Sequence, residues 1–144
     1  TLPFWKRVIQ LPYMSIRYDL IYMIRDQHIH IPFSQILDLC LECISNIQDD
    51  KEANDIIECL LLHYKNNIIA LLSSKQPTNV VKDLIRNLQN IYQITIQFAD
   101  YNNRTKLAHA IAKERVPDLL SLYNLLDWND HDILTSISTI LYLI

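Results

Sequence analysis

The chain contains no glycine, although about 7% of the residues in an average protein are glycine. Phosphate-binding loops, dinucleotide-binding folds and nucleophile elbows need glycine for tight turns and close backbone approach. Two-residue β-hairpins also prefer it. The absence of glycine therefore excludes the usual forms of these sites. It favours an all-α fold whose turns are marked by polar residues or proline.

Strong charge and long apolar runs are lacking as well. The net charge is −3, whereas binding to a phosphate backbone requires a basic face, so we expect no nucleic-acid partner. No apolar run reaches the roughly 18 residues of a membrane-spanning helix, so we expect no membrane span. Half of the 144 residues are apolar and a fifth are charged, which is typical of one globular domain.

Cysteine is scarce, and its three copies favour reduced thiols and an intracellular location, in the cytoplasm, the nucleus or both. Cys40 and Cys43 have the spacing of a zinc knuckle or a redox pair. A structural zinc ion needs four ligands, and no second pair with this spacing follows, although Cys59 and His63 could complete a set in principle. Reduced cysteine packs as a small hydrophobe. We therefore predict core positions for Cys40 and Cys43, with no metal and no cofactor.

Apolar periodicity and helix-capping residues predict helices throughout the chain. Breaks are expected at Pro12, at residues 30–32, at Asn66-Asn67, at Pro77 and at Val116-Pro117. Asp49 or Asp50 is the expected N-cap of the fourth helix. The nine predicted helices cover approximately residues 3–11, 14–27, 33–47, 50–65, 68–73, 79–100, 105–115, 116–126 and 130–144.

The apolar positions of the long helices recur along the chain at offsets of 48 and 49 residues. Two shorter helices precede each long helix and align in the same order, the first of them more loosely. One such unit cannot bury its apolar face alone, so neighbouring units would stack and share a core. The matching positions are Ile36, Leu37, Cys40, Cys43 and Ile44, then Leu84, Ile85, Leu88, Ile91 and Tyr92, then Ile133, Leu134, Ile137, Ile140 and Leu141.

Three helices per unit, with proline opening the second helix in "ERVPDLLSLYNLL", resemble the armadillo repeat, as does Asn90 in "LIRNLQNIYQ". The family's usual glycine before the second helix is replaced by Arg115 and Tyr64, and the period is longer than usual. The resemblance, to a degenerate armadillo- or HEAT-like array, implies an all-α, right-handed superhelix (solenoid) of about three three-helix repeats. The expected domain covers residues 1–144, with approximate repeats 3–48, 49–101 and 102–144. Because the chain ends inside an apolar pattern, "SISTILYLI", we expect it to be part of a longer array.

The resemblance also implies that the long helices line a concave surface, where their polar positions would form a ladder across neighbouring repeats. Asparagine suits such a ladder because its amide both donates and accepts, so it can pair with both backbone groups of an extended peptide. Carboxylates in the ladder favour a basic segment. The candidate partner-binding residues are Gln35, Asp38, Glu42, Asp83, Arg86, Asn87, Asn90, Asp132, Thr135, Ser136 and Thr139.

We therefore expect a non-enzymatic interaction scaffold or adaptor with a protein or peptide partner, for example a transport adaptor that recognises basic signals. No Ser-His-Asp order and no distinctive carboxylate pair is found, so we predict no catalytic residues. One alternative is a regulatory domain that docks a GTPase or a cytoskeletal protein. Another is a compact bundle of the Bcl-2 kind, as in viral cell-death inhibitors, which would bind an amphipathic helix in an apolar groove. Against the bundle, no predicted helix is apolar on all sides.

Overall fold

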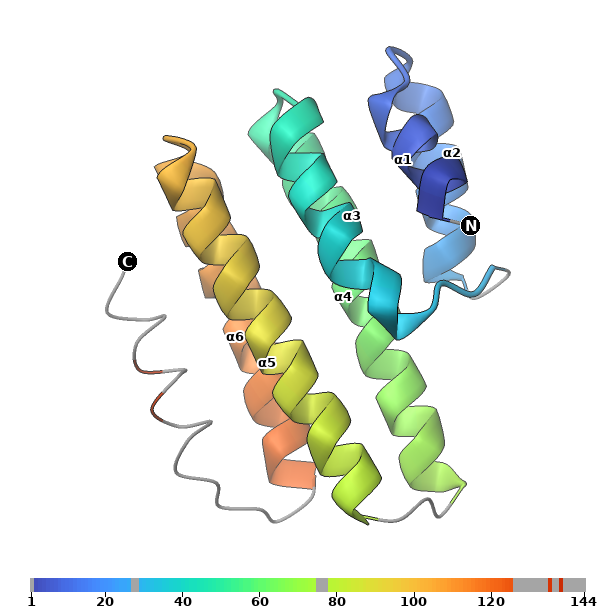
Figure 1. Ribbon diagram of the computed structural model, residues 1–144, viewed down its shortest axis with the longest axis vertical. Coiled ribbons are helices and arrows are strands. Elements are labelled where there is room, and N and C mark those ends of the chain that lie inside the picture. The colour runs from blue at the N-terminus through green and yellow to red at the C-terminus, as the bar shows by residue number, and fades with distance from the viewer. Residues whose placement is uncertain (1, 27–28, 75–77, 126–134, 136–137, 139–144) are drawn as a thin grey trace. The chain divides into compact units, whose positions relative to one another are not determined.

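A computed structural model describes residues 2–26, 29–74, 78–125, 135 and 138 of the chain. The described residues contain six long helical segments and no β-strand (Figure 1), which confirms the all-α prediction. The helices are α1 (Leu2–Gln10), α2 (Met14–Arg25), α3 (Phe33–Asn46), α4 (Asp50–Ser73), α5 (Thr78–Tyr101) and α6 (Thr105–Leu125).

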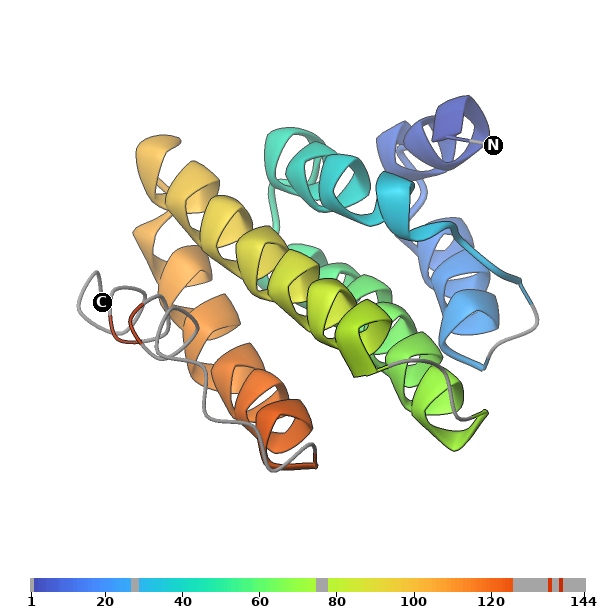
Figure 2. The ribbon, with the colours of Figure 1, turned by 60° about the horizontal axis from the view of Figure 1, so that its bottom comes forward.

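The chain divides into two compact units, Thr1–Tyr64 and Lys65–Ile144, and the boundary lies inside α4. In the first unit, α1 packs against both α2 and α3. In the second unit, α5 and α6 form a helical hairpin and lie side by side (Figures 1 and 2). The predicted repeat bounds remain a prediction.

An amphipathic pattern explains how α5 and α6 pack. One side of α5 is buried at positions three or four residues apart, and α6 has a buried side with similar spacing. The fully or almost fully buried members on α5 include Val81, Ile85, Leu88, Tyr92, Ile96 and Ala99. On α6 they include Leu107, Ala108, Ile111, Ala112, Val116, Leu119 and Leu122.

Helix α4 is continuous, so the predicted turn at Asn66-Asn67 is wrong. Asparagine in a helix interior costs less than about 0.7 kcal/mol relative to alanine. The buried residues Leu60, Tyr64 and Ile68 follow one another at four-residue spacing on both sides of the asparagines. Packing of this apolar side outweighs the weak local preference of the two asparagines for a turn.

Helix α6 is also continuous, and the predicted restart of the helix at Val116-Pro117 is wrong. A proline inside a helix removes one backbone hydrogen bond and clashes with the carbonyl four residues earlier, here that of Lys113. Both Pro117 and Lys113 are exposed, so water can reach that carbonyl. The buried side of the helix continues through Ala112, Val116 and Leu119 without a change of register. Burial of this side against α5 keeps the helix intact.

Other helix ends agree with the sequence. Helix α1 ends before Pro12, and α3 begins directly after Pro32. Asp49 is the N-cap of α4, as one of the two predicted candidates, because its Oδ1 accepts a hydrogen bond from the Lys51 amide at 3.0 Å. These ends follow from local chemistry, which explains why the sequence predicts them.

The turn between α5 and α6 shows how the chain reverses direction without glycine. Asn103 has φ of 63°, in the left-handed region that usually selects glycine at the end of a helix. The Arg104 amide donates to the Ala99 carbonyl at 2.8 Å, and the Asn103 amide donates to the Asp100 carbonyl at 3.0 Å. These two hydrogen bonds define a Schellman motif, with asparagine at its left-handed position.

Among the described helices, α4 alone has the length and apolar composition of a helix that could cross a membrane. Of its most apolar stretch of 18 residues, 44% is buried within the protein. The core helix of a globular domain can have the same length and apolar composition. The expectation that the chain has no membrane span therefore remains untested.

Replacing Pro117 by alanine tests the continuity of α6. We expect Pro117→Ala to raise the free energy of unfolding by about 1–3 kcal/mol, because alanine restores the amide donor to the Lys113 carbonyl and removes the ring clash. Urea denaturation measures the change. Pro32→Ala is the matched control, since the N-cap amide of α3 has no intrahelical acceptor; it should bring no gain. An unchanged or lower value for Pro117→Ala would favour a helix that starts at this proline.

Substitutions at Asn103 test the α5–α6 turn. Asn103→Ala should lower the free energy of unfolding by about 1 kcal/mol, because alanine lacks the short polar side chain through which asparagine tolerates the left-handed region. Asn103→Gly should not lower it. The control is Asn90→Ala, at an exposed position inside α5, where alanine favours the helix. Equal effects of Asn103→Ala and Asn90→Ala in thermal or urea unfolding would contradict the assignment of this turn.

Candidate functional site

Two of the three predicted partner-binding residues on α3 form contacts with side chains of α1. The Lys6 ammonium forms an ion pair with Asp38, at 3.0 Å between Nζ and Oδ2. The Gln10 amide donates to Glu42 Oε1 at 2.7 Å. Hydrogen bonding to Asp38 raises the pKa of Lys6. A ligand that approached Asp38 and Glu42 would compete with side chains of the chain itself.

The third predicted residue of α3, Gln35, is half-buried. Its Oε1 atom is buried and accepts no hydrogen bond from the described residues. Its position therefore differs from that of an exposed ligand-binding amide.

The predicted residues on α5 share one exposed side of the helix. Asp83, Arg86, Asn87 and Asn90 are all exposed, and the Arg86 guanidinium pairs with Asp83 at 3.2 Å. The same side continues in steps of three or four residues beyond Asn90. We call it the α5 stripe, and its members are Asp83, Arg86, Asn87, Asn90, Ile94, Gln97 and Tyr101.

The α5 stripe is mostly neutral and carries two apolar side chains. Three of its members are amides, at Asn87, Asn90 and Gln97. Ile94 is 41% exposed and Tyr101 is 86% exposed. Helical periodicity predicted the first four members of this side, but the two apolar members were not identified as binding candidates. An exposed tyrosine at the helix end would have been the signal for them.

The third predicted group lies mostly outside the described residues. Thr135 is exposed. Asp132, Ser136 and Thr139 lie outside the part of the chain that the structure describes. The structure therefore brings together the α5 members in the second unit, and places the α3 members in the first unit.

A second exposed surface, which the sequence did not indicate, lies on α2 and the residue before it. Five large apolar side chains within eleven residues are between 41% and 63% exposed. We call this the α2 apolar surface. Ile16 and Met23, seven residues apart, share one side of the helix, whereas Met14 and Tyr22 lie on other sides of it. The members are Tyr13, Met14, Ile16, Tyr22 and Met23.

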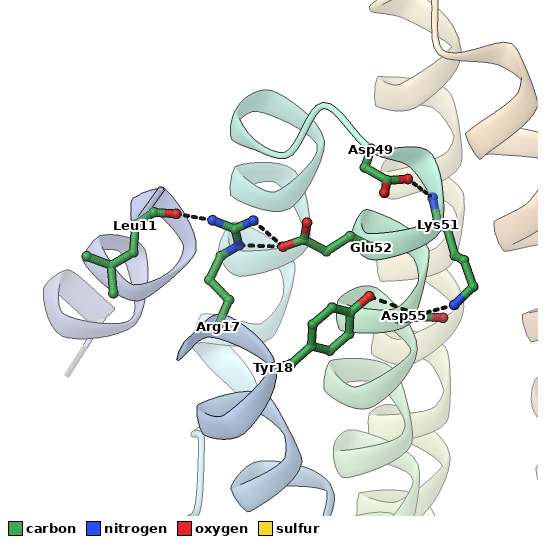
Figure 3. A network of polar contacts seen from close by, with 7 residues as sticks. All are labelled: Leu11, Arg17, Tyr18, Asp49, Lys51, Glu52 and Asp55. Atoms are coloured by element: carbon green, nitrogen blue, oxygen red, sulfur yellow. Dashed lines mark hydrogen bonds and ion pairs between the residues drawn. The ribbon is translucent and has the colours of Figure 1, made fainter. Parts of the chain in front are cut away.

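A buried ion pair joins α2 to α4 in the first unit (Figure 3). The Arg17 guanidinium donates to Glu52 through Nε and Nη2, and to the Leu11 carbonyl through Nη1. The side chains of Arg17 and Glu52 are only 11% and 4% exposed. Arg17 therefore links the end of α1, the start of α2 and the first turn of α4.

A second link between the same helices lies beside this ion pair (Figure 3). The Tyr18 hydroxyl donates to Asp55 Oδ2 at 3.1 Å, and the Lys51 ammonium contacts the same oxygen at 3.2 Å. Burial, followed by the hydrogen bond to Asp55, raises the pKa of Tyr18 above its ordinary value. The phenol stays protonated, so it serves as a fixed hydrogen-bond donor.

The three cysteines lie in the core. Cys40 and Cys43 have no exposed area and Cys59 is 6% exposed, which confirms the predicted core positions. Burial raises the pKa of the Cys43 thiol well above its ordinary value, so the thiolate that would react or bind metal is disfavoured. Within the described ranges, no three His, Cys, Asp or Glu side chains are grouped so that they could hold a metal ion.

Removing Arg17 tests the weight of the buried ion pair. Arg17→Met should lower the free energy of unfolding by about 3–5 kcal/mol, because the Glu52 carboxylate is left buried without a countercharge. The double variant Arg17→Met, Glu52→Leu should cost less than Arg17→Met alone. Lys51→Met, in the exposed pair with Asp55, is the control and should change stability by less than about 0.5 kcal/mol. A double variant that loses as much stability as Arg17→Met alone, or more, in urea unfolding would refute the coupling.

No family model matches this sequence, and no curated protein or solved structure matches it either. The function therefore has to be inferred from the contacts and the exposed surfaces of the chain itself.

Proposed function

We propose that the chain is a non-enzymatic protein-interaction scaffold, which binds an extended segment of a partner protein along the α5 stripe. The observation that carries this proposal is the α5 stripe itself. Four residues selected by helical periodicity as partner-binding are exposed on one side of a 24-residue helix. That side has amides at its centre and apolar side chains toward its end.

The chemistry of the stripe suits a peptide backbone. An amide offers a donor and an acceptor, so Asn87 and Asn90 can each pair with an N–H and a C=O of an extended chain. Side chains three or four residues apart on a helix are about 5–6 Å apart at their Cβ atoms. Alternate residues of an extended peptide repeat at about 6.6 Å, a comparable distance. Ile94 and Tyr101 would contribute apolar contact, and tyrosine is enriched among the residues that dominate binding energy.

The charges favour a partner segment that is close to neutral. Three carboxylates of the predicted ladder, Asp38, Glu42 and Asp83, already have partners within the chain. Their negative charge is thus partly compensated. A basic transport-signal peptide remains a version of the proposal, as does a GTPase or a cytoskeletal protein as the partner. The side chains of the α5 stripe favour a partner segment that pairs through its backbone and makes apolar contacts.

We also propose that the chain is built from armadillo-like repeats. Three of the five aligned positions on α3 and α5 are buried in both helices: Cys40, Cys43 and Ile44 on α3, and Leu88, Ile91 and Tyr92 on α5. The aligned first helices of the predicted units also place buried apolar residues at matching positions, such as Val8, Leu60 and Ile111. In the predicted repeats 49–101 and 102–144, the short and middle helices are joined into one continuous helix, α4 and α6 respectively. The proposed repeat is therefore closer to a helix pair than to three separate helices.

A second candidate function is favoured by the α2 apolar surface. Met14 and Met23 are flexible and adapt to varied partners, and Tyr13 and Tyr22 supply large contact areas. The side of α2 that carries Ile16 and Met23 would contact the apolar face of an amphipathic helix, as in the Bcl-2-like alternative. This binding mode would select periodic apolar anchors and would depend on α2.

Selection from a displayed library of random peptides, roughly a dozen residues long, tests both candidates. We expect the chain to enrich peptides that bind at least about tenfold more weakly to the Asn87→Ala, Asn90→Ala variant, because each lost hydrogen bond contributes about 0.5–1.5 kcal/mol. The matched control is Asn124→Ala, an exposed asparagine on α6. Circular dichroism confirms that each variant is folded.

The result that contradicts binding at the α5 stripe is equal affinity of the selected peptides for the parent chain and the double variant. If these peptides instead have helical apolar periodicity and lose affinity on Met23→Ser, the α2 apolar surface is the binding site. Failure to enrich any peptide would contradict both candidates.

A further inference from the structure

One buried histidine holds a segment that is distant in sequence. The Ile31 amide, between α2 and α3, donates to Nε2 of His63 on α4 at 3.0 Å. His63 is only 3% exposed, and Ile31 has no exposed area. The two residues are 32 positions apart and lie in the same compact unit. This hydrogen bond therefore connects residues 29–32, which we call the α2–α3 segment, to α4.

The hydrogen bond requires the neutral form of the imidazole. Nε2 can accept a hydrogen bond only when it carries no proton, so the single proton of neutral His63 lies on Nδ1. A second proton would turn Nε2 into a donor that faces another donor. The buried Ile31 amide would then lose its acceptor, which is costly inside a protein. Protonation and this contact exclude each other.

The surroundings of His63 add to this effect. Nδ1 is buried and makes no hydrogen bond to the described residues. The ring of His30, in the α2–α3 segment, lies 5.4 Å from the His63 ring, centroid to centroid. His30 is exposed, and its electrostatic effect lowers the pKa of His63. Burial and the neighbouring His30 both disfavour a positive charge on His63.

The groups that face His63 from the neighbouring elements are few. Helix α2 presents the backbone of Ile24, and the α2–α3 segment presents the His30 ring and the Ile31 amide. None of the described carboxylates acts on the pKa of His63. Burial lowers this pKa from the ordinary 6.5 and His30 lowers it further, while the backbone groups of Ile24 and Ile31 raise it by less. No nearby negative charge stabilises an imidazolium.

The segment that His63 holds continues directly into α3. Pro32 is the N-cap of α3, and the Phe33 ring packs on the ring of Tyr64, with 4.2 Å between centroids. His63 and Tyr64 are adjacent on α4, so together they contact the segment from His30 to Phe33. The polar contact is the part of this attachment that a proton can break.

We propose that His63 and His30 form a proton-sensitive clasp, which holds the α2–α3 segment on α4 at neutral pH and releases it locally on acidification. The direction of this pH dependence follows from the thermodynamic linkage between proton binding and the closed state. A group that binds protons less well in the closed state destabilises that state as pH falls below its ordinary pKa. The clasp is therefore closed above about pH 6.5 and opens as the pH falls below this value. This inference does not depend on the proposed peptide binding.

Amide hydrogen exchange at Ile31 tests the clasp on the whole chain. After correction for the intrinsic exchange rate, protection should fall roughly tenfold to 30-fold between pH 7.5 and pH 5, because each pH unit below about 6.5 favours the open form up to tenfold. In His63→Gln, whose side-chain oxygen can still accept but does not titrate, protection should be independent of pH. In His30→Gln, an exposed substitution, the fall should be smaller than in the parent chain.

Three results would overturn the clasp. They are constant protection of Ile31 in the parent chain, an equal fall in His63→Gln, and a parallel fall at the Leu88 and Ile111 amides of the second unit. The last result would indicate global unfolding. If His63→Gln does not fold, His30→Gln still tests the pair, and a fall equal to that of the parent chain removes His30 from the clasp.

Discussion

The fold of the first unit depends on one arginine. Helix α1 stops at Pro12, so its last carbonyls have no helical partners. The Arg17 guanidinium donates a hydrogen bond to the carbonyl of Leu11, the residue that follows α1, and also neutralises the buried Glu52 carboxylate. Three helices thus meet at a single cation. Because Glu52 is in the first turn of α4, the same contact places a negative charge at the positive end of that helix dipole.

Local signals in the sequence predicted the helix ends that local chemistry controls. Asp49 caps α4 through its own side chain, and Pro12 and Pro32 separate the first three helices. The signals at Asn66-Asn67 and Pro117 failed because they compete with long apolar sides that pack elsewhere in the unit. Whether a proline ends a helix depends on how much burial lies on both sides of it, and that quantity is not local.

The same distinction applies to the candidate site. Helical periodicity was sufficient to predict that Asp83, Asn87 and Asn90 share one side of α5. It could not predict that Lys6 and Gln10 would engage Asp38 and Glu42, because 32 residues separate each pair in the sequence. The contact between Ile31 and His63 was missed for the same reason. Long-range polar contacts leave no periodic pattern in a single sequence.

The left-handed asparagine of the α5–α6 turn has a chemical consequence for the lifetime of the protein. Asparagine deamidates when the backbone nitrogen of the next residue attacks its side-chain carbonyl carbon. At Asn103 that nitrogen belongs to Arg104, and its N–H is held by the Ala99 carbonyl at 2.8 Å. The nitrogen attacks after its N–H loses the proton, and the hydrogen bond to Ala99 disfavours that loss. The contact that lets a glycine-free chain turn also slows the ageing of the residue on which the turn depends.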